Sequence, residues 1–354
     1  MNDSQFGWMM TASGRPLERR ELHLGAPKPG EAVVSVAGCG LCHTDISFLH
    51  LGVKTRAELP LVLGHEVSGV VRAVGEGVAQ NLVGQNVVVP AVLPCDDCEL
   101  CRAGLRTICR AQVMPGNDRH GGFANELVVP ARTLCPVPPA ALERHELWQL
   151  SVVADAVSTP FMAVRRAGVV PGDFAVVVGA GGIGIYAVQI AAAAGARVVA
   201  LDVDDGKLEQ ARALGAAAAV NVRDLGEKEL RAAVSVEAKR LGASRFAWKV
   251  FETSGTRAGQ STAFSLINHG GYVAIVGFTM DKLEVRLSNL MAFDATLRGN
   301  WGCDPALYPE ILEWIGAGRI QVSPLVEKHP LDEINEVIEA AHAGKLQRRA
   351  VLVP

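Results

Sequence analysis

The 354-residue sequence predicts an α/β protein of two domains, a barrel-like antiparallel domain and a doubly wound parallel sheet. Three observations predict this fold. The first third holds short apolar runs broken by Gly and Pro, which are strand and turn signals. Beyond about residue 155, apolar strands alternate with alanine-rich helical segments. The chain is also long enough for two separate hydrophobic cores.

Each element of the first domain follows from its own apolar run. We expect strands within 32–38, 67–78, 86–94 and 123–130. The tail from Leu307 contains two helical segments and a final strand near 350–353. It leaves the alternating pattern of the second domain, so we expect it to rejoin the first.

The second domain begins with a strand, helix, strand and helix, predicted at 174–178, 183–194, 197–201 and 207–214. Further buried strands are predicted at 247–251 and 272–276. The expected domains are therefore 1–156 with 299–354, and 157–298.

Composition and charge restrict the class of protein. A formal net charge of −3 gives no reason to expect binding to nucleic acid or to a membrane surface. A hydrophobic content of 49% and a mean hydropathy of +0.22 indicate a well-packed soluble protein. The segment MNDSQFGWMM lacks signal-peptide features, so the eight cysteines are expected to be reduced thiols in the cytoplasm. The uncharged stretch 174–196 has the length of a membrane span, but its glycines favour a strand, a turn and a buried helix.

Four cysteines lie in the segment PCDDCELCRAGLRTIC, with the spacing C-x2-C-x2-C-x7-C. Cys95, Cys98, Cys101 and Cys109 suit a tetrahedral metal, and zinc is the usual occupant of an all-sulfur site. The alternatives are two disulfides or an iron–sulfur cluster. The cluster is disfavoured because the ferredoxin pattern continues C-x3-C-P, whereas the last gap here is seven residues and Arg follows Cys109. We therefore predict structural zinc.

A glycine fingerprint directly follows the predicted strand at 174–178 and opens a helix. Gly179, Gly181 and Gly184 fit a tight turn, close approach to pyrophosphate and helix–strand packing, with Gly182 and Ile183 between them. Asp202, at the end of the next strand, is expected to accept hydrogen bonds from the adenine ribose.

The nicotinamide cofactor is expected to be NAD. Asp204 and Asp205 add negative charge and no arginine is adjacent in sequence, so NAD is favoured over NADP. Lys207 is a candidate for the ribose or a solvated helix charge. Flavin is ranked lower, because flavin fingerprints usually lie near the N-terminus of a chain.

Two further motifs lie upstream. Cys42-His43-Thr44-Asp45 follows Cys39, and Gly64-His65-Glu66 begins the pattern G-H-E-x2-G-x5-G. With the cysteine segment and the glycine fingerprint in this order, the chain resembles the zinc-dependent medium-chain alcohol dehydrogenases over essentially its whole length. The resemblance implies a GroES-like catalytic domain, an NAD-binding Rossmann domain, and two zinc ions per chain, one catalytic and one structural.

The same resemblance assigns the catalytic ligands. Cys42 and His65 match zinc ligands, and Glu66 matches a residue in or close to the shell around them. The third ligand is usually a cysteine before a T-x3-A-[LV] helix start, and the matching residue here is Asp155, ahead of Thr159. A carboxylate would complete three protein ligands with an open fourth position and would make the site harder. The alternative is that Asp155 caps the helix or only supports the ligands.

Roles in proton transfer also follow from the resemblance. Thr44 matches the hydroxyl that touches the substrate alcohol and passes its proton outward, and His43 matches a position near the cofactor pyrophosphate. Many relatives carry a relay histidine where this chain has Ser47, with His50 further on, so the proton route stays open. The implied reaction activates the alcohol with zinc as a Lewis acid and transfers hydride to nicotinamide.

The substrate is less determined. Ala91 stands where relatives acting on small alcohols often carry an aromatic residue, which predicts a widened pocket, and Trp301 is a candidate wall. Segments at 8–11, 154–161 and 278–302 resemble the 6-hydroxycyclohex-1-ene-1-carbonyl-CoA dehydrogenases of anaerobic aromatic degradation. This implies a cyclic hydroxyacyl-CoA substrate. Its candidate CoA-binding cations, equally explained as solvated charges, are Lys54, Arg56 and Arg119.

Alternative functions stay open at this point. They are oxidation of another secondary alcohol or polyol, and zinc-assisted addition of water to the enone product. A nonenzymatic NAD-binding relative is disfavoured by the metal-ligand pattern at Cys42, His65 and Asp155. The family pairs sheet edges of the cofactor domain, so a homodimer or homotetramer is expected.

The remaining cysteines and histidines receive mostly structural predictions. Cys39 is expected to pack behind the catalytic site, and Cys135 and Cys303 to be buried free thiols. His120 lies in a loop that is expected to approach the substrate cleft or to be structural. The histidines expected to be structural or at the surface are His23, His145, His269, His329 and His342.

Overall fold

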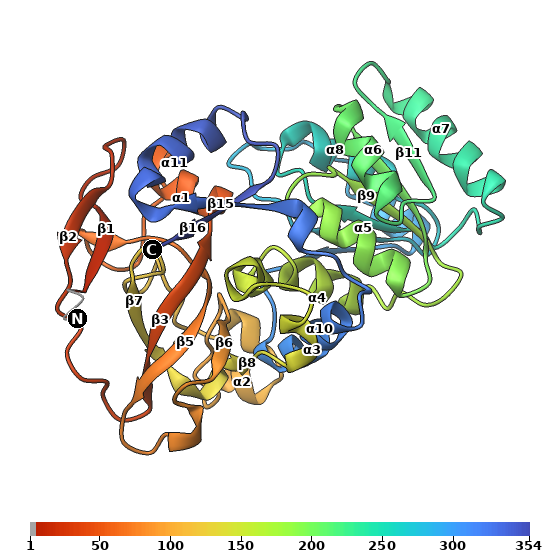
Figure 1. The fold of residues 1–354 in the computed structure, drawn as a ribbon. Helices are drawn as coiled ribbons and strands as arrows, with labels where there is room; N and C mark the ends of the chain where they lie inside the picture. Colours follow the sequence, from red (N-terminus) through yellow and green to blue (C-terminus); the bar gives the residue numbers. More distant parts are fainter. Residues whose placement is uncertain (1–4) are drawn as a thin grey trace. The chain divides into compact units, whose positions relative to one another are not determined.

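The computed structural model describes residues 5–354, and the chain divides into two compact units (Figure 1). The first unit combines Met1–Ser158 with Gly302–Pro354, and the second is Thr159–Trp301.

The first unit contains two sheets. The larger runs β15-β16-β3-β5-β6-β8, with β7 also paired to β3, and the smaller runs β2-β1-β4. All pairs are antiparallel except β15 with β16. The strands are β1 Phe6–Met10, β2 Glu18–Glu21, β3 Glu31–Gly40, β4 Leu61–Val62, β5 Glu66–Val74, β6 Asn86–Val89, β7 Glu126–Pro130, β8 Cys135–Pro136, β15 Val326–Pro330 and β16 Arg349–Val353. The predicted antiparallel domain is confirmed.

The four runs expected as strands correspond to β3, β5, β6 and β7. The sequence missed β1, β2, β4, β8 and β15. Strand β2 has the sequence ERRE and is exposed throughout, so it carries no hydrophobic alternation. Strands β4 and β8 have two residues each, too few for a periodic pattern.

The tail joins the first unit, since β16 pairs with β3 in the larger sheet. Apolar residues of α11, including Ile334 and Ile338, enter the same core as Val34 and Val36 of β3. The helices of this unit are α1 His43–His50, α2 Glu99–Arg102, α3 Pro139–Leu142, α10 Tyr308–Gly316 and α11 Ile334–His342. Its 3₁₀ helices are Gln80–Leu82, Arg106–Ile108, Ala131–Thr133, Leu147–Ala154, Pro305–Leu307, Ser323–Leu325 and Leu331–Glu333.

The second unit is a parallel sheet in the order β11-β10-β9-β12-β13-β14. This order confirms the doubly wound prediction, because the chain starts centrally, winds outward, and then reverses across β9. The strands are β9 Phe174–Val178, β10 Arg197–Asp202, β11 Ala218–Asn221, β12 Lys249–Glu252, β13 Tyr272–Ile275 and β14 Thr296–Gly299. The helices are α4 Ser158–Arg166, α5 Gly184–Ala193, α6 Asp205–Ala213, α7 Glu227–Arg240, α8 Arg257–Ser265 and α9 Ser288–Phe293.

Both faces of this sheet are covered. Phe174, Val176 and Val178 share a core with apolar residues of α7 and α8, whereas Ala175 and Val177 are equally buried between them. Successive strand residues point to opposite faces, so β9 is buried on both. The predicted strand at 247–251 begins later, at Lys249, because Ala247 has a left-handed backbone with φ of 55°.

The uncharged stretch 174–196 forms strand β9, the glycine turn and α5, as predicted. Within residues 5–354, no single helix is long and apolar enough to cross a membrane. One bent pair, Leu147–Ala154 with Ser158–Arg166, reaches that length and composition only when both helices are taken together.

Candidate metal centres and dinucleotide site

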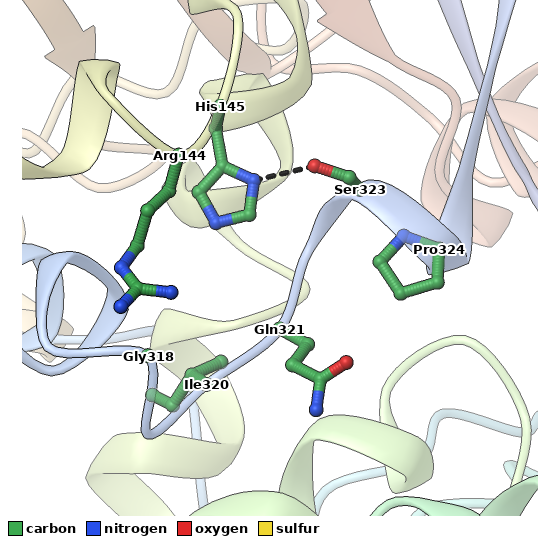
Figure 2. Close-up of a pocket in the computed structure, with 7 residues that line it drawn as sticks. All are labelled: Arg144, His145, Gly318, Ile320, Gln321, Ser323 and Pro324. Carbon is green, nitrogen blue, oxygen red and sulfur yellow. Dashed lines mark hydrogen bonds between the residues drawn. The ribbon is translucent and has the colours of Figure 1, made fainter.

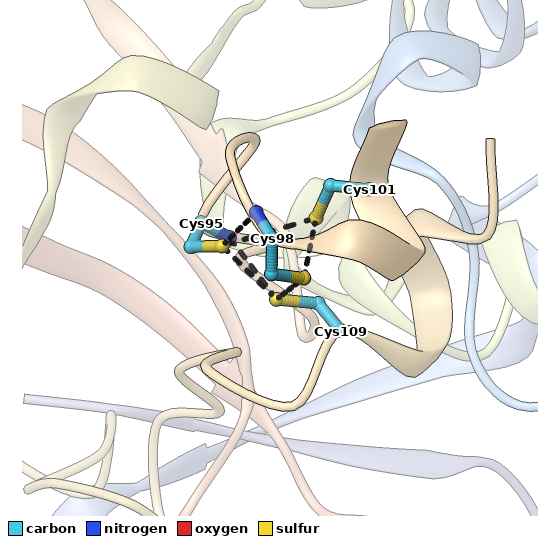
Figure 3. A group of neighbouring side chains, drawn as sticks. All are labelled: Cys95, Cys98, Cys101 and Cys109. Atoms are coloured by element: carbon cyan, nitrogen blue, oxygen red, sulfur yellow. Dashed lines mark hydrogen bonds between the residues drawn. The ribbon is translucent and has the colours of Figure 1, made fainter. Parts of the chain in front are cut away.

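The segment 95–109, the cysteine lobe, brings its four cysteines together in the first unit (Figure 3). The sulfur of Cys95 lies 3.5 Å from that of Cys109 and 3.9 Å from that of Cys101. The sulfur of Cys98 lies 3.6 Å from those of both Cys101 and Cys109. A zinc tetrahedron with bonds of about 2.3 Å has sulfur–sulfur edges of about 3.8 Å, whereas a disulfide needs about 2.05 Å. The four sulfurs therefore fit a zinc ion, and all are free thiols.

The surroundings of the four thiols change their pKa values in ways that favour a bound cation. A backbone hydrogen bond from Cys101 lowers the pKa of Cys98 to about 6, and those from Asp97 and Cys98 lower the pKa of Cys95. Burial raises the pKa of Cys101 to about 12 and that of Cys109 as well, so these two thiols need a positive charge to ionise. With four sulfur ligands the centre is closed, so its role is structural.

The second centre brings together Cys42, His65 and Asp155, whose ligand atoms lie within 4.8 Å of one another. The Oδ2 atom of Asp155 is 3.6 Å from both Cys42 Sγ and His65 Nε2. Cys42 precedes α1, His65 precedes β5, and Asp155 follows the 3₁₀ helix Leu147–Ala154. A thiolate, an imidazole and a carboxylate around one point fit a zinc site with an open fourth position.

Asp45 holds two of these ligands in place. Its carboxylate accepts hydrogen bonds from the N–H of Cys42 and of Gly64, at 3.0 Å each. Its Oδ1 also lies 3.5 Å from His65 Nδ1, the nitrogen that faces away from Asp155. Asp45 ends the C-H-T-D motif, but the motif alone does not indicate this supporting role.

The charges around His65 favour a cation at this centre. Burial by itself lowers the pKa of His65, but Asp45, Cys42 and Asp155 together raise it well above its ordinary value. Three groups that can carry negative charge thus surround one buried ring. A divalent metal satisfies this charge balance, so the residues present fit zinc.

Glu66 lies beside the centre in a buried ion pair. The Arg349 guanidinium donates two hydrogen bonds of 2.7 Å to its carboxylate, and the Ala156 N–H donates a third of 3.0 Å. Burial raises the pKa of Glu66 although Arg349 opposes this. Glu66 therefore fixes the peptide immediately after Asp155. Arg349 was missed because it lies 283 residues from Glu66 in sequence.

The predicted proton-transfer residues lie at the start of α1. Thr44 Oγ1 is 3.7 Å from Cys42 Sγ, and His43 is exposed. The Ser47 hydroxyl is buried and donates to the His43 carbonyl at 2.8 Å. His50 stacks on His342 with ring centroids 4.7 Å apart and lies 3.3 Å from Glu339.

In the second unit, the glycine fingerprint fills the turn from β9 to α5. Gly179 has φ of 90°, and a Cβ there would lie 2.7 Å from Ser254 Cα. A Cβ on Gly184 would lie 1.7 Å from the Gly179 carbonyl oxygen. A Cβ on Gly181 would meet nothing within 4 Å, which leaves open space beside the backbone. The loop thus fits a pyrophosphate, while the contacts of Gly182 and Ile183 with a cofactor stay predictions.

Asp202 ends β10, and most acceptor positions of its carboxylate are occupied by backbone N–H groups. Its carboxylate accepts hydrogen bonds from the N–H of Ala180 at 2.7 Å, Val203 at 2.8 Å and Asp204 at 3.0 Å. A carboxylate offers about four acceptor sites, so one remains for a ribose hydroxyl. Asp204 caps the start of α6 by accepting a 3.0 Å hydrogen bond from the Lys207 N–H, and the Lys207 side chain is exposed.

No arginine is adjacent to Asp202 in sequence, but the fold brings Arg223 close to this position. Arg223, just beyond β11, donates a 2.8 Å hydrogen bond to the Val203 carbonyl next to Asp202. Strands β10 and β11 are parallel neighbours, so their carboxyl ends meet at one edge of the sheet. A cation is therefore held at the residue that follows Asp202, and, after the hydrogen bond from the Lys207 N–H, its charge helps to lower the pKa of Asp204.

Other residues singled out from the sequence have hydrogen-bond or ion-pair partners within the first unit. His120 Nδ1 accepts a hydrogen bond from the Val62 N–H, and burial lowers its pKa. Arg56 pairs with Asp118, and Arg119 pairs with Glu31 at 2.9 Å. These two guanidinium groups are thus engaged within the first unit. The buried cysteines outside both centres are Cys39, Cys135 and Cys303.

A separate cavity of about 370 Å³ lies in the first unit (Figure 2). His145 and Ser323 face each other across part of its wall, with 2.6 Å between His145 Nδ1 and Ser323 Oγ. Ser323 in turn donates to Gln149 at 3.0 Å. Burial, together with Arg144, lowers the pKa of His145. His145 therefore has a structural hydrogen-bonded role, and the cavity contains none of the metal ligands.

One unit thus carries two candidate metal centres and the other a sheet with a dinucleotide-binding fingerprint, an arrangement typical of a metal-dependent dehydrogenase. Two family models match the chain, the alcohol dehydrogenase GroES-like domain over residues 28–139 and the zinc-binding dehydrogenase over residues 182–317. An alcohol dehydrogenase from Geobacillus stearothermophilus is 30% identical over 347 residues, covering 96% of each chain.

Two solved structures are similar over nearly the whole chain. The cobalt- and zinc-bound thermostable alcohol dehydrogenase from Pyrobaculum aerophilum has a TM-score of 0.84 and 25% identity, covering 99% of this chain and 100% of that one. Acetophenone reductase from Geotrichum candidum in complex with NAD has a TM-score of 0.85 and 25% identity, covering 100% and 98%. The chain belongs to the zinc-dependent alcohol dehydrogenase family, whose activity is NAD(P)-linked oxidoreduction.

Proposed function

We propose that this chain catalyses the NAD-linked oxidation of a secondary alcohol to a ketone at the Cys42–His65–Asp155 centre. The observation that carries the proposal is the convergence of three different ligand types within 4.8 Å, which leaves a fourth position for substrate oxygen. Zinc held there would supply a Lewis acid that lowers the pKa of an alcohol, and NAD would supply the hydride acceptor. The name of the Geotrichum relative, acetophenone reductase, supports the ketone–secondary alcohol pair.

Thr44 is proposed as the first proton carrier. Its hydroxyl lies 3.7 Å from the Cys42 sulfur and therefore next to the ligand atoms. The exposed His43 beside it is proposed to release the proton to solvent. We do not route the proton through Ser47, because its hydroxyl donates to the His43 carbonyl.

A set of variants tests this route. Thr44→Ala should lower kcat by about 10²-fold, the low end for a lost general acid–base group. Thr44→Ser should restore most of that loss, and Ser47→Ala should leave kcat nearly unchanged. A large loss in Ser47→Ala together with a small one in Thr44→Ala would reassign the relay.

NAD is proposed over NADP because Asp202 keeps one acceptor position and its negative charge at the end of β10. Arg223 opposes this preference, since it places a guanidinium beside the Val203 carbonyl. The ratio of kcat/KM for NAD and NADP tests the balance. Arg223→Ala should raise the preference for NAD, and a preference of the unchanged chain for NADP would contradict the proposal.

The particular substrate proposed is a cyclic hydroxyacyl-CoA, the 6-hydroxycyclohex-1-ene-1-carbonyl thioester. Its support is the resemblance at 8–11, 154–161 and 278–302, together with the small Ala91 close to the centre, whose N–H lies 3.3 Å from the Ala154 carbonyl. Of the three candidate cations, Lys54 is exposed and forms no ion pair within the described residues 5–354, whereas Arg56 and Arg119 are paired with carboxylates.

An NAD-reduction screen tests the substrate class. It compares simple secondary alcohols, polyols and cyclic hydroxyacyl-CoA thioesters with the same zinc-loaded protein. Thioesters are expected to have the highest kcat/KM. Activity with simple alcohols alone would remove the CoA assignment and leave the dehydrogenase, whereas no NAD reduction with any alcohol would overturn both.

The chain is proposed to form a homo-oligomer through the edge strand β14. This strand ends the six-stranded sheet and all four of its residues are exposed. Leu287, Met291 and Leu297 on and near it are exposed apolar side chains. A second copy pairing along this edge would satisfy the backbone groups and cover the apolar surface. Light scattering should give a dimer or tetramer that Leu297→Asp weakens, and a monomer at assay concentration would contradict this.

A further inference from the structure

Asp155 stands at the catalytic centre where the family usually has a cysteine, and its side chain is longer than that of cysteine. A carboxylate oxygen lies one covalent bond further from Cβ than a cysteine sulfur does. The backbone must therefore sit at a different distance from the metal if the carboxylate is to serve as ligand. The 3₁₀ helix before it ends at Ala154, and Asp155 itself has φ of −140° and ψ of −60°. Its position is consequently not set by a regular helix or strand.

The peptide before Asp155 is held by three donors. The Ala154 carbonyl accepts a 2.5 Å hydrogen bond from the Tyr308 hydroxyl and a 3.1 Å bond from the Ser158 hydroxyl. The Ala91 N–H lies 3.3 Å from the same oxygen. Ser158 Oγ is also 3.1 Å from the Tyr308 hydroxyl, so the two side chains form one connected group on this carbonyl.

The peptide after Asp155 is held separately, since the Ala156 N–H donates to Glu66 and Glu66 is paired with Arg349. Asp155 thus stands between two fixed peptides. Removing either support would free the backbone on one side of the ligand.

The Tyr308 hydroxyl contributes hydrogen bonds rather than packing volume. Tyr308 and Ser158 are fully buried, and a phenylalanine would fill nearly the same volume as Tyr308. Burial raises the pKa of the Tyr308 phenol well above 10, so the hydroxyl stays a donor. It reaches Ala154 from α10, 154 residues away in sequence, at the residue directly before the ligand.

We propose that Tyr308 and Ser158 are positioning residues that hold the Ala154–Asp155 peptide so that the Asp155 carboxylate serves as the third zinc ligand. The inference rests on the assignment of Asp155 as a ligand. It extends the catalytic centre to α10, whose N-terminal residue is Tyr308.

The test measures zinc affinity at this centre by competition with a chromogenic chelator. The variants are Tyr308→Phe, Ser158→Ala and the double variant. Each single change should weaken zinc binding about tenfold and the double change by up to about a hundredfold, the range seen when supports of metal ligands are removed. The cysteine-lobe zinc should be retained throughout. Cobalt(II) bound in place of zinc should show a changed visible absorption spectrum, which a purely structural role would not alter.

Matched controls remove a buried hydroxyl elsewhere. Tyr186→Phe is the control for Tyr308→Phe, at a buried tyrosine of α5 in the second unit. Ser151→Ala is the control for Ser158→Ala, at a buried serine in the same 3₁₀ helix as Ala154. Both control variants should have the same zinc affinity and cobalt(II) spectrum as the unsubstituted protein. Circular dichroism verifies that every variant is folded.

Asp155→Asn distinguishes the ligand assignment of Asp155 from the positioning role of Tyr308 and Ser158. Weaker zinc binding in Asp155→Asn, with unchanged affinity and spectrum in Tyr308→Phe and Ser158→Ala, would overturn the positioning role alone. Unchanged zinc binding in Asp155→Asn would overturn the ligand assignment on which it rests. A lowered melting temperature without a change in affinity or spectrum would make Tyr308 merely structural.

Discussion

The cysteine-lobe centre takes all four ligands from residues 95–109, whereas the second centre takes its three from residues 42, 65 and 155. The Cys95 sulfur is held by backbone N–H groups of the same short loop, since it accepts hydrogen bonds from Asp97 and Cys98. The second centre depends on side chains from distant segments, including Asp45, Glu66 and Tyr308. A closed centre can be built locally, but an open centre must be held from outside because one coordination position is left for substrate.

The largest expected effect comes from removing a ligand of the open centre. His65→Ala should lower kcat for NAD reduction by at least about 10³-fold, because Lewis-acid stabilisation is worth several kcal/mol. Zinc content should fall from two ions per chain to one, with the lobe unaffected. His329→Ala, which removes a histidine paired with Glu327, is the control. A His65→Ala variant that keeps both zinc ions would contradict the assignment of His65 as a ligand of the open centre.

Treatment with a chelator should separate the centres without mutation. The open centre has three protein ligands, one of them a carboxylate, so it should release zinc before the four-sulfur lobe does. Activity should disappear with the first ion lost and return when zinc is added back. Zinc content and NAD reduction are followed on the same samples. Loss of the first ion with full activity retained would mean that the lobe is the weaker centre.

Removing a lobe ligand should affect stability rather than chemistry. Cys109→Ser should destabilise the first unit by about 3 kcal/mol, since a structural metal contributes folding free energy. Thermal unfolding and limited proteolysis within 95–109 measure this effect, while kcat per folded molecule should change little. Cys135→Ser, at a buried cysteine outside both centres, is the matched control. Equal destabilisation in both variants would argue against a metal in the lobe.

The smallest expected effect concerns the identity of the third ligand. Asp155→Cys should weaken zinc binding by about tenfold despite the softer thiolate, because both flanking peptides are held for the longer carboxylate. Chelator competition measures the change. Combining Asp155→Cys with Tyr308→Phe should recover part of the zinc affinity, since the backbone at residue 155 can then move closer to the metal. Tighter binding in Asp155→Cys alone would mean that ligand type outweighs backbone position.

The sequence by itself determined the features whose parts lie close together along the chain. The cysteine lobe, the glycine turn at Gly179–Gly184 and the alternating strands and helices of the second unit are local patterns with one sterically reasonable structure. The ligand trio Cys42, His65 and Asp155 was reached by resemblance to a family rather than by spacing. Even so, the aspartate was recognised as the departure from the usual pattern.

Only the tertiary structure decided which distant side chains support these sites. Arg223 reaches Val203 because β10 and β11 are parallel neighbours, so the fold adds a cation that the residues adjacent to Asp202 in sequence do not supply. Tyr308 reaches Ala154, and Arg349 reaches Glu66, across separations of 154 and 283 residues. Such contacts leave no periodic or spacing signal in one sequence, since they arise when packing of the core brings separate elements together.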